Sequence, residues 1–126
     1  MSTTVLVVDD NEDNVHILRS SLLKCGYEVR IARDGPSALA SVRQQRPDVI
    51  LLDVMMPGMD GMEVLDHLKL DPKTASIPVV MVTARTQDED LLAGYQSGAE
   101  YYITKPFTPA QILHAIGLVL GSQEPG

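Results

Sequence analysis

The chain has 126 residues, a formal net charge of −7 at pH 7, 44% hydrophobic residues and 4% aromatic residues. One domain of this length buries roughly two thirds of its unfolded surface, so it can form a core without disulfides or metals. The negative charge repels a phosphate backbone, and tryptophan is absent with only one phenylalanine, so direct nucleic-acid binding is not expected. The hydrophobic content also excludes a disordered acidic tail.

The N-terminal residues and the cysteine content predict a soluble cytoplasmic protein. Cys25 is the only cysteine, so no internal disulfide can form, and we interpret it as a small hydrophobic residue near a helix end. The first basic residue is Arg19, and a strand pattern already begins by Thr4, which does not resemble a secretory signal. No apolar run approaches the roughly 20 residues that would span a bilayer.

The first predicted elements are a buried strand and an amphipathic helix. Four apolar residues at 5–8 end at Asp9 and Asp10, and residues 11–13 supply a cap and an acidic first turn. The following helix ends at Gly26. Its residues predicted to face inward are Val15, Leu18, Leu22 and Cys25.

A second strand and helix precede the central strand. Residues 27–32 alternate charged with apolar side chains, which indicates a strand near an edge. The sequence Asp34-Gly35-Pro36 opens a helix whose inward residues are Ala38, Leu39 and Val42. Residues 49–52 are a continuous apolar run, typical of a strand buried on both faces, and the run stops at Asp53 before a Pro/Gly turn. Asp53 is therefore predicted at the carboxyl end of a strand, where side chains of such sheets meet water.

The remaining chain continues the alternation without a repeat or a linker. The predicted elements are a helix at 61–70 with Met62, Leu65 and Leu68 on one face, a strand at 77–82, a helix at 87–97, a strand at 101–104 and a helix at 108–120. Five strands alternating with five helices predict a doubly wound parallel sheet, because parallel neighbours need crossover helices.

Four strands end in hydrophilic residues at one edge of this sheet. These residues are Asp9, Asp10, Asp53, Thr83 and Lys105. Each alone is most often a helix cap or a solvated charge, but three crowded carboxylates would repel one another, so positive charge is expected among them. Lys105 supplies one charge, and oxygen-only ligands suit Mg²⁺. An ionised aspartate beside Mg²⁺ and lysine has the groups required for in-line phosphoryl transfer.

The histidines are not expected to bind a metal. His16, His67 and His114 lie on three different predicted helices, without the spacing of metal ligands.

From Thr4 to Leu120 the residues resemble the receiver domain of bacterial two-component response regulators. The resemblance rests on Asp9-Asp10, on Asp53 followed by Met56-Pro57-Gly58-Met59-Asp60-Gly61, on Thr83-Ala84 and on Tyr102-Ile103-Thr104-Lys105-Pro106-Phe107. It implies a CheY-like (flavodoxin-like) fold with strand order 2-1-3-4-5. The domain is expected at residues 1–122, followed by a short polar tail at 123–126.

The resemblance assigns a role to each residue at the sheet edge. Asp53 is implied to be the phosphoacceptor, supplied by the phosphohistidine of a histidine kinase or phosphotransfer protein. Mg²⁺ would be held by Asp10, Asp53 and the backbone carbonyl of Met55, with Asp9 assisting. Lys105 would pair with the phosphate, next to a cis peptide bond at Pro106.

Two further pairs of residues are assigned through the resemblance. Thr83 and Tyr102 are implied to be the switch pair. Met55 and Arg85 occupy the tuning positions and resemble those of the subgroup fused to winged-helix transcription factors. Neither side chain is a carboxylate or amide that would orient an attacking water, so we predict slow self-dephosphorylation.

The output surface of similar domains comprises the helix at 87–97, the strand at 101–104 and the helix at 108–120. Here this surface carries Leu91, Tyr101, Gln111 and Ala115 in place of most of the charges that pair in dimers of that subgroup. We interpret it as a partly apolar docking surface for a downstream protein; the alternative is that Leu91 or Tyr101 packs onto the core. A monomer or a weak phosphorylation-dependent dimer is expected.

Three other functions are weighed against a phosphorylated switch. An aspartyl phosphatase would carry a second acid at position 55, which is Met55, so the chain is not expected to be an enzyme acting on an external substrate. A flavin or nucleotide carrier would have a phosphate-binding loop at 9–13, which is acidic instead. A phosphorylation-independent interaction module of the same fold remains the alternative. The sequence does not distinguish a stand-alone receiver from part of a longer regulator or hybrid kinase.

Overall fold

The computed structural model describes residues 3–54, 58–59, 61–83 and 98–121, excluding the side chain of Thr83. Five parallel strands form one sheet in the order β2-β1-β3-β4-β5. The strands are β1 (Thr4–Val8), β2 (Glu28–Ala32), β3 (Val49–Asp53), β4 (Val79–Thr83) and β5 (Tyr101–Thr104). The described helices are α1 (Glu12–Lys24), α2 (Gly35–Gln44), α3 (Gly61–Leu70) and α5 (Pro109–Gly121). The fold class and strand order expected from the sequence are confirmed, whereas the helix predicted over 87–97 lies outside the described residues.

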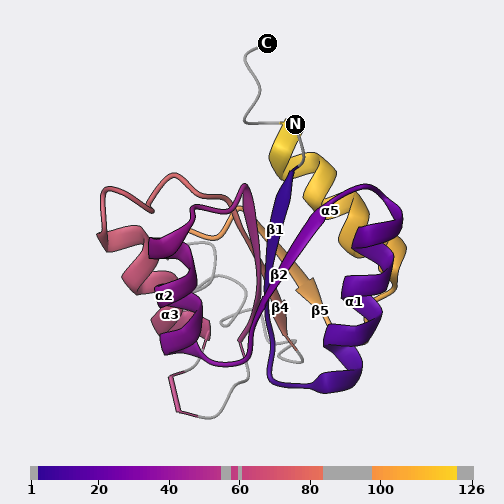
Figure 1. Ribbon diagram of the computed structural model, residues 1–126, viewed down its shortest axis with the longest axis horizontal. Helices are drawn as coiled ribbons and strands as arrows, with labels where there is room; N and C mark the ends of the chain where they lie inside the picture. The colour runs from indigo at the N-terminus through magenta and orange to yellow at the C-terminus, as the bar shows by residue number, and fades with distance from the viewer. Residues whose placement is uncertain (1–2, 55–57, 60, 84–97, 122–126) are drawn as a thin grey trace.

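The four described helices cover the two faces of the sheet, two on each face. In Figure 1, α2 and α3 lie on one side of the strands, and α1 and α5 lie on the other. This arrangement buries both faces, which explains why β1, β3 and β4 are nearly continuous apolar runs. The edge strand β2 is more polar, as its alternating sequence predicts.

Alternate residues of each central strand enter two separate cores. Leu6 and Leu52 belong to the core beneath α2 and α3, whereas Val7 and Leu51 belong to the core beneath α1 and α5. Successive side chains of a strand point to opposite faces, so a single apolar run supplies both layers. All four residues are at most 1% exposed.

The inward residues predicted for α1 are confirmed at three positions and wrong at one. Val15, Leu18 and Leu22 are buried, but Cys25 is exposed. Cys25 is the C-cap residue, where the chain has left the helix, so the helical spacing no longer directs its side chain toward the sheet. None of the helices in the described residues combines the length and the apolar character needed to cross a membrane.

Helix α2 begins at a capping aspartate. The carboxylate of Asp34 accepts a hydrogen bond of 2.7 Å from the backbone N–H of Ser37, and Pro36 occupies the first turn. The backbone hydrogen bond from Ser37 lowers the pKa of Asp34, because it stabilises the ionised carboxylate.

Helix α3 begins against the end of β3 at a glycine. The backbone N–H of Gly61 donates to the carbonyl of Val54 at 3.0 Å. A Cβ atom at Gly61 would lie 2.7 Å from the Cα of Val54 and would also overlap the backbone of Asp53. Only glycine permits this close approach, so Gly61 helps to fix the backbone that carries the Asp53 side chain.

Candidate functional site

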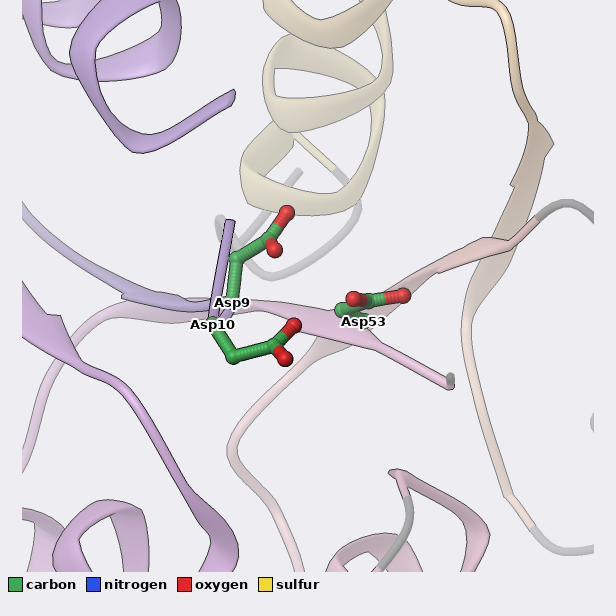
Figure 2. Close-up of side chains that lie close together, drawn as sticks. All are labelled: Asp9, Asp10 and Asp53. Carbon is green, nitrogen blue, oxygen red and sulfur yellow. The ribbon is translucent and has the colours of Figure 1, made fainter. Parts of the chain in front are cut away.

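Three carboxylates meet where β1 and β3 end. The register pairs Val8 with Leu52, so Asp9 and Asp53 come next on adjacent strands. Carboxylate oxygens of Asp9, Asp10 and Asp53 lie within 4.8 Å of one another. Figure 2 shows these three side chains gathered at the sheet edge. The parallel topology thus brings together residues separated by more than forty positions in the sequence.

Asp9 is held in place by the start of α1. Its Oδ1 accepts a hydrogen bond of 2.9 Å from the backbone N–H of Asn11, and its Oδ2 accepts one of 3.3 Å from the side-chain amide of Asn14. The side chain of Asp9 is buried, whereas Asp10 is exposed. The two adjacent aspartates therefore differ in environment: hydrogen bonds fix the carboxylate of Asp9, whereas the carboxylate of Asp10 is exposed to solvent.

Lys105 supplies the positive charge expected among the carboxylates. Its ammonium Nζ lies 3.4 Å from Oδ1 of Asp53, and its side chain is 24% exposed. Lys105 directly follows β5, and the Lys105–Pro106 peptide bond is cis, the isomer expected from the sequence.

Asp53 is less accessible than its position at a strand end predicts. Its side chain is only 2% exposed, so the expectation that it meets water is wrong for this conformation. A strand end fixes where the carboxylate lies, but the groups around it decide whether solvent reaches it. Among these neighbours are Asp9, Asp10 and the Lys105 ammonium.

The charges at the site favour a bound cation. At an effective dielectric constant of ~20, two carboxylates 4.8 Å apart repel by about 3.5 kcal/mol. Within the described part of the chain, these three carboxylates and the ammonium of Lys105 sum to a charge of −2. The donor atoms are all oxygens, and one of the three aspartates is exposed. This donor set fits Mg²⁺, which binds one or two carboxylates and keeps several waters.

Several predicted site residues are described only in part or not at all. Thr83 ends β4 beside β5, but its side chain lies outside the described structure, as do Met55 and Arg85. Tyr102 lies in β5, and its side chain is 8% exposed and packs in the core beneath α2 and α3. The three histidines are exposed on α1, α3 and α5, and among the described residues the group that could hold a metal contains none of them.

The predicted docking surface needs one correction. Tyr101 is half-buried and Gln111 is exposed, but Ala115 is fully buried in the core between α5 and the sheet. Its position in α5 places it on the inward stripe with Ile112 and Ile116, so it cannot belong to a surface. Leu91 lies outside the described residues.

Sequence reasoning missed the role of Asn14. Its side chain donates to Asp9 from the first turn of α1. The sequence contained one signal for this contact: Asn14 carries an amide side chain and lies one helical turn after the Asp-Asp pair, close to the capping Asn11.

The site thus consists of an acidic cluster at the carboxyl edge of a parallel sheet, with a lysine facing one of its aspartates. The sequence matches the response regulator receiver domain over residues 5–117. The chain belongs to this family, whose members are signalling switches that receive signals from histidine kinases.

Individual relatives agree with this assignment. The chain is 53% identical to response regulator PleD of Caulobacter vibrioides over 106 residues, which are 84% of this chain and 23% of PleD. It is 38% identical to PhoP of Bacillus subtilis, an alkaline phosphatase synthesis transcriptional regulatory protein, over 98% of this chain and 51% of PhoP. The chain thus spans about half or less of these relatives. The solved structure of chemotaxis protein CheY4 of Vibrio cholerae superimposes with a TM-score of 0.89 at 34% identity, covering 94% of this chain and 99% of CheY4.

Proposed function

We propose that Asp53 accepts a phosphoryl group from the phosphohistidine of a histidine kinase or a phosphotransfer protein. A carboxylate oxygen of Asp53 forms a bond to phosphorus while the phosphorus–nitrogen bond to the partner's imidazole breaks, and the ring nitrogen retains the electron pair. The observation that carries the proposal is the Lys105 ammonium 3.4 Å from Asp53, beside the carboxylates of Asp9 and Asp10.

Each neighbouring group has a proposed part in this transfer. Asp10 and Asp53, with the backbone carbonyl of Met55 and with Asp9 assisting, would hold Mg²⁺. When bound, the metal would neutralise charge on the transferred phosphoryl oxygens. Lys105 would exchange its contact with Asp53 for a contact with the phosphate, because the phosphate carries more charge than the carboxylate.

Access to Asp53 requires a local movement. A side chain that is 2% exposed cannot meet an incoming phosphorus atom in line, so a neighbouring group must first move. Lys105 is a described neighbour that can move, because its flexible side chain is partly exposed and makes one long ion pair. We propose that its displacement accompanies phosphoryl transfer.

The signal would be transmitted from the phosphate to the surface around β5. In this proposal the hydroxyl of Thr83 contacts the phosphate, and the ring of Tyr102 changes position behind it. The altered surface then binds a downstream protein, and the domain is a monomer or a weak dimer that forms on phosphorylation. Light scattering with and without a phosphate mimic measures this association.

Met55 and Arg85 are proposed to make the phosphorylated form long-lived. Neither provides a carboxylate or amide to position water for attack on the acyl phosphate. A phosphoryl half-life of only seconds in the isolated protein with Mg²⁺ would contradict this assignment.

Phosphorylation is tested with Mg²⁺ and a small acyl-phosphate donor. The intact mass of the native chain should increase by one phosphoryl group, whereas Asp53→Asn should gain none. Equal gains, or no gain in either protein, would reject Asp53 as the acceptor, and no gain would favour the phosphorylation-independent interaction module. Lys105→Ala should retain some phosphorylation but lose the coupled change around β5.

A further inference from the structure

A second charged site lies at the opposite edge of the sheet from the three aspartates. A hollow of about 440 Å³ opens between the end of α2 and the connection from α3 to β4. This edge contains the amino ends of the parallel strands, whereas the aspartates follow their carboxyl ends. The residues that line the hollow are Val42, Arg43, Arg46, Asp71, Lys73 and Thr74.

The hollow is positively charged in a protein that is strongly negative. Arg43, Arg46 and Lys73 contribute three positive charges and Asp71 one negative charge, which gives a local charge of +2. The whole chain has only ten lysines and arginines and a net charge of −7. A favourable interaction with the carbonyl end of α2 explains a cation at Arg43, which lies in the last turn, but it does not explain Lys73 on another segment.

The guanidinium of Arg46 is held in place by neutral groups. Its Nη1 donates to the backbone carbonyl of Lys73 at 2.8 Å, and its Nη2 donates to the hydroxyl of Ser76 at 2.7 Å. These contacts fix the orientation of Arg46 and join two segments about thirty residues apart. Because neither acceptor is charged, the positive charge of Arg46 is not neutralised.

The other two cations are free to bind a ligand. In the described part of the chain, the side chains of Arg43 and Lys73 have no hydrogen bond or ion pair. The carboxylate of Asp71 accepts from the backbone N–H of Lys73 at 2.9 Å, which orders the turn that carries Lys73. The hollow therefore combines one fixed guanidinium with two cations that have no partner.

We propose that this hollow binds a diphosphate group, either as free pyrophosphate or as part of a nucleotide. The guanidinium of Arg43 can match two oxygens of a phosphate, and Lys73 adds a point charge, while Arg46 contributes its charge from a fixed position. Three cations around one compact hollow suit a small anion with several oxygens better than an extended acidic chain. The local charge of +2 complements the two or three negative charges of a diphosphate.

Binding is measured by calorimetry and by amide NMR shifts, with the full chain and inorganic pyrophosphate. EDTA is present throughout, so that no metal links the anion to the three aspartates. We expect saturable binding that weakens as salt rises from about 20 to about 150 mM. The shifts should concentrate at residues 42–46 and 73–74.

A double substitution with a matched control tests the assignment. Arg43→Gln with Lys73→Gln should weaken pyrophosphate binding at least about tenfold, because two charged contacts are lost. Arg46 is left unchanged because it joins the two segments. The control, Arg19→Gln with Lys24→Gln, removes the same two charges from exposed positions of α1 and should change affinity less than about threefold.

The remaining comparisons identify the ligand. Equal affinities for ADP and pyrophosphate would show that the diphosphate group alone is recognised, and tighter ADP binding with shifts at the same residues would assign a nucleotide. Both results support the proposal. Absence of saturable binding, equal losses in both double variants, or tighter binding of a six-glutamate peptide at these residues would overturn it.

Discussion

Replacing Asp10 with asparagine should stabilise the magnesium-free protein. Asp10 has carboxylate oxygens of Asp9 and Asp53 within 4.8 Å. At an effective dielectric constant of ~20, each of these repulsions would be about 3.5 kcal/mol. Asp10 is exposed, so water and salt reduce its share substantially, and we expect Asp10→Asn to raise the free energy of unfolding by about 1 kcal/mol in EDTA.

Magnesium should reverse the order of stability. If Mg²⁺ binds only the folded native chain, as proposed, a concentration of ten times its Kd should add about 1.4 kcal/mol to the free energy of unfolding. Asp10→Asn removes one proposed ligand, so its stability should respond much less to Mg²⁺. Urea denaturation in EDTA and in saturating MgCl₂ measures both effects.

Asp66→Asn is the matched control for this experiment. Asp66 is an exposed aspartate on α3 that is not part of the carboxylate cluster. It should leave both the stability in EDTA and the response to Mg²⁺ nearly unchanged. Destabilisation by Asp10→Asn in EDTA would contradict the assigned repulsion, and a response to Mg²⁺ equal to that of the native chain would contradict the assigned ligand.

Three predictions concern the framework of the fold. Gly61→Ala should cost about 1–3 kcal/mol of stability in urea denaturation, because its Cβ would lie 2.7 Å from the Cα of Val54; an unchanged midpoint would show that the chain relaxes freely there. Leu65→Ala should cost about 2–5 kcal/mol in the same assay, because Leu65 is fully buried, and a cost below about 1 kcal/mol would contradict this packing. The lowered pKa of Asp34 stabilises the fold above the unfolded-state pKa, and this contribution disappears as pH falls through the folded-state pKa. The destabilisation by Asp34→Ala should therefore shrink in acid, and a loss independent of pH would exclude the hydrogen bond from Ser37 as its cause.

The sheet could be predicted from the sequence because its central strands are nearly continuous apolar runs. Residues 49–53 form an apolar run that ends at a carboxylate, and the structure places them in β3 at the centre of the sheet. Because parallel strands share one carboxyl edge, Asp9 and Asp53 could be brought together on topology alone. The carboxylate cluster therefore follows from the order of strands and helices along the chain, and the hydrophobic pattern of the sequence predicts that order.

Solvent exposure was harder to predict, because it depends on which other parts of the protein pack against each residue. Cys25 continues a helical stripe but is exposed at the C-cap, and Ala115 was placed on a surface but is buried. Asp53 was placed correctly but is covered. In each case the sequence gives a residue's position within its element, whereas exposure depends on where the element ends and on its neighbours.

The sequence pattern also did not predict side-chain contacts between segments that are distant in the sequence. Arg46 and Ser76 are thirty residues apart, and neither belongs to a recognisable motif. Their hydrogen bond depends on how the end of α2 meets the connection before β4. The positively charged hollow at that junction is therefore a property of the tertiary structure that the sequence pattern does not indicate.

Asp53 is proposed to be the one carboxylate that accepts the phosphoryl group. Treating the phosphorylated chain with borohydride reduces an acyl phosphate at aspartate to homoserine, and tandem mass spectrometry of the peptides locates it. We expect homoserine at position 53 alone. Homoserine at position 9 or 10, or a phosphoryl group found on a histidine with none on Asp53, would contradict it.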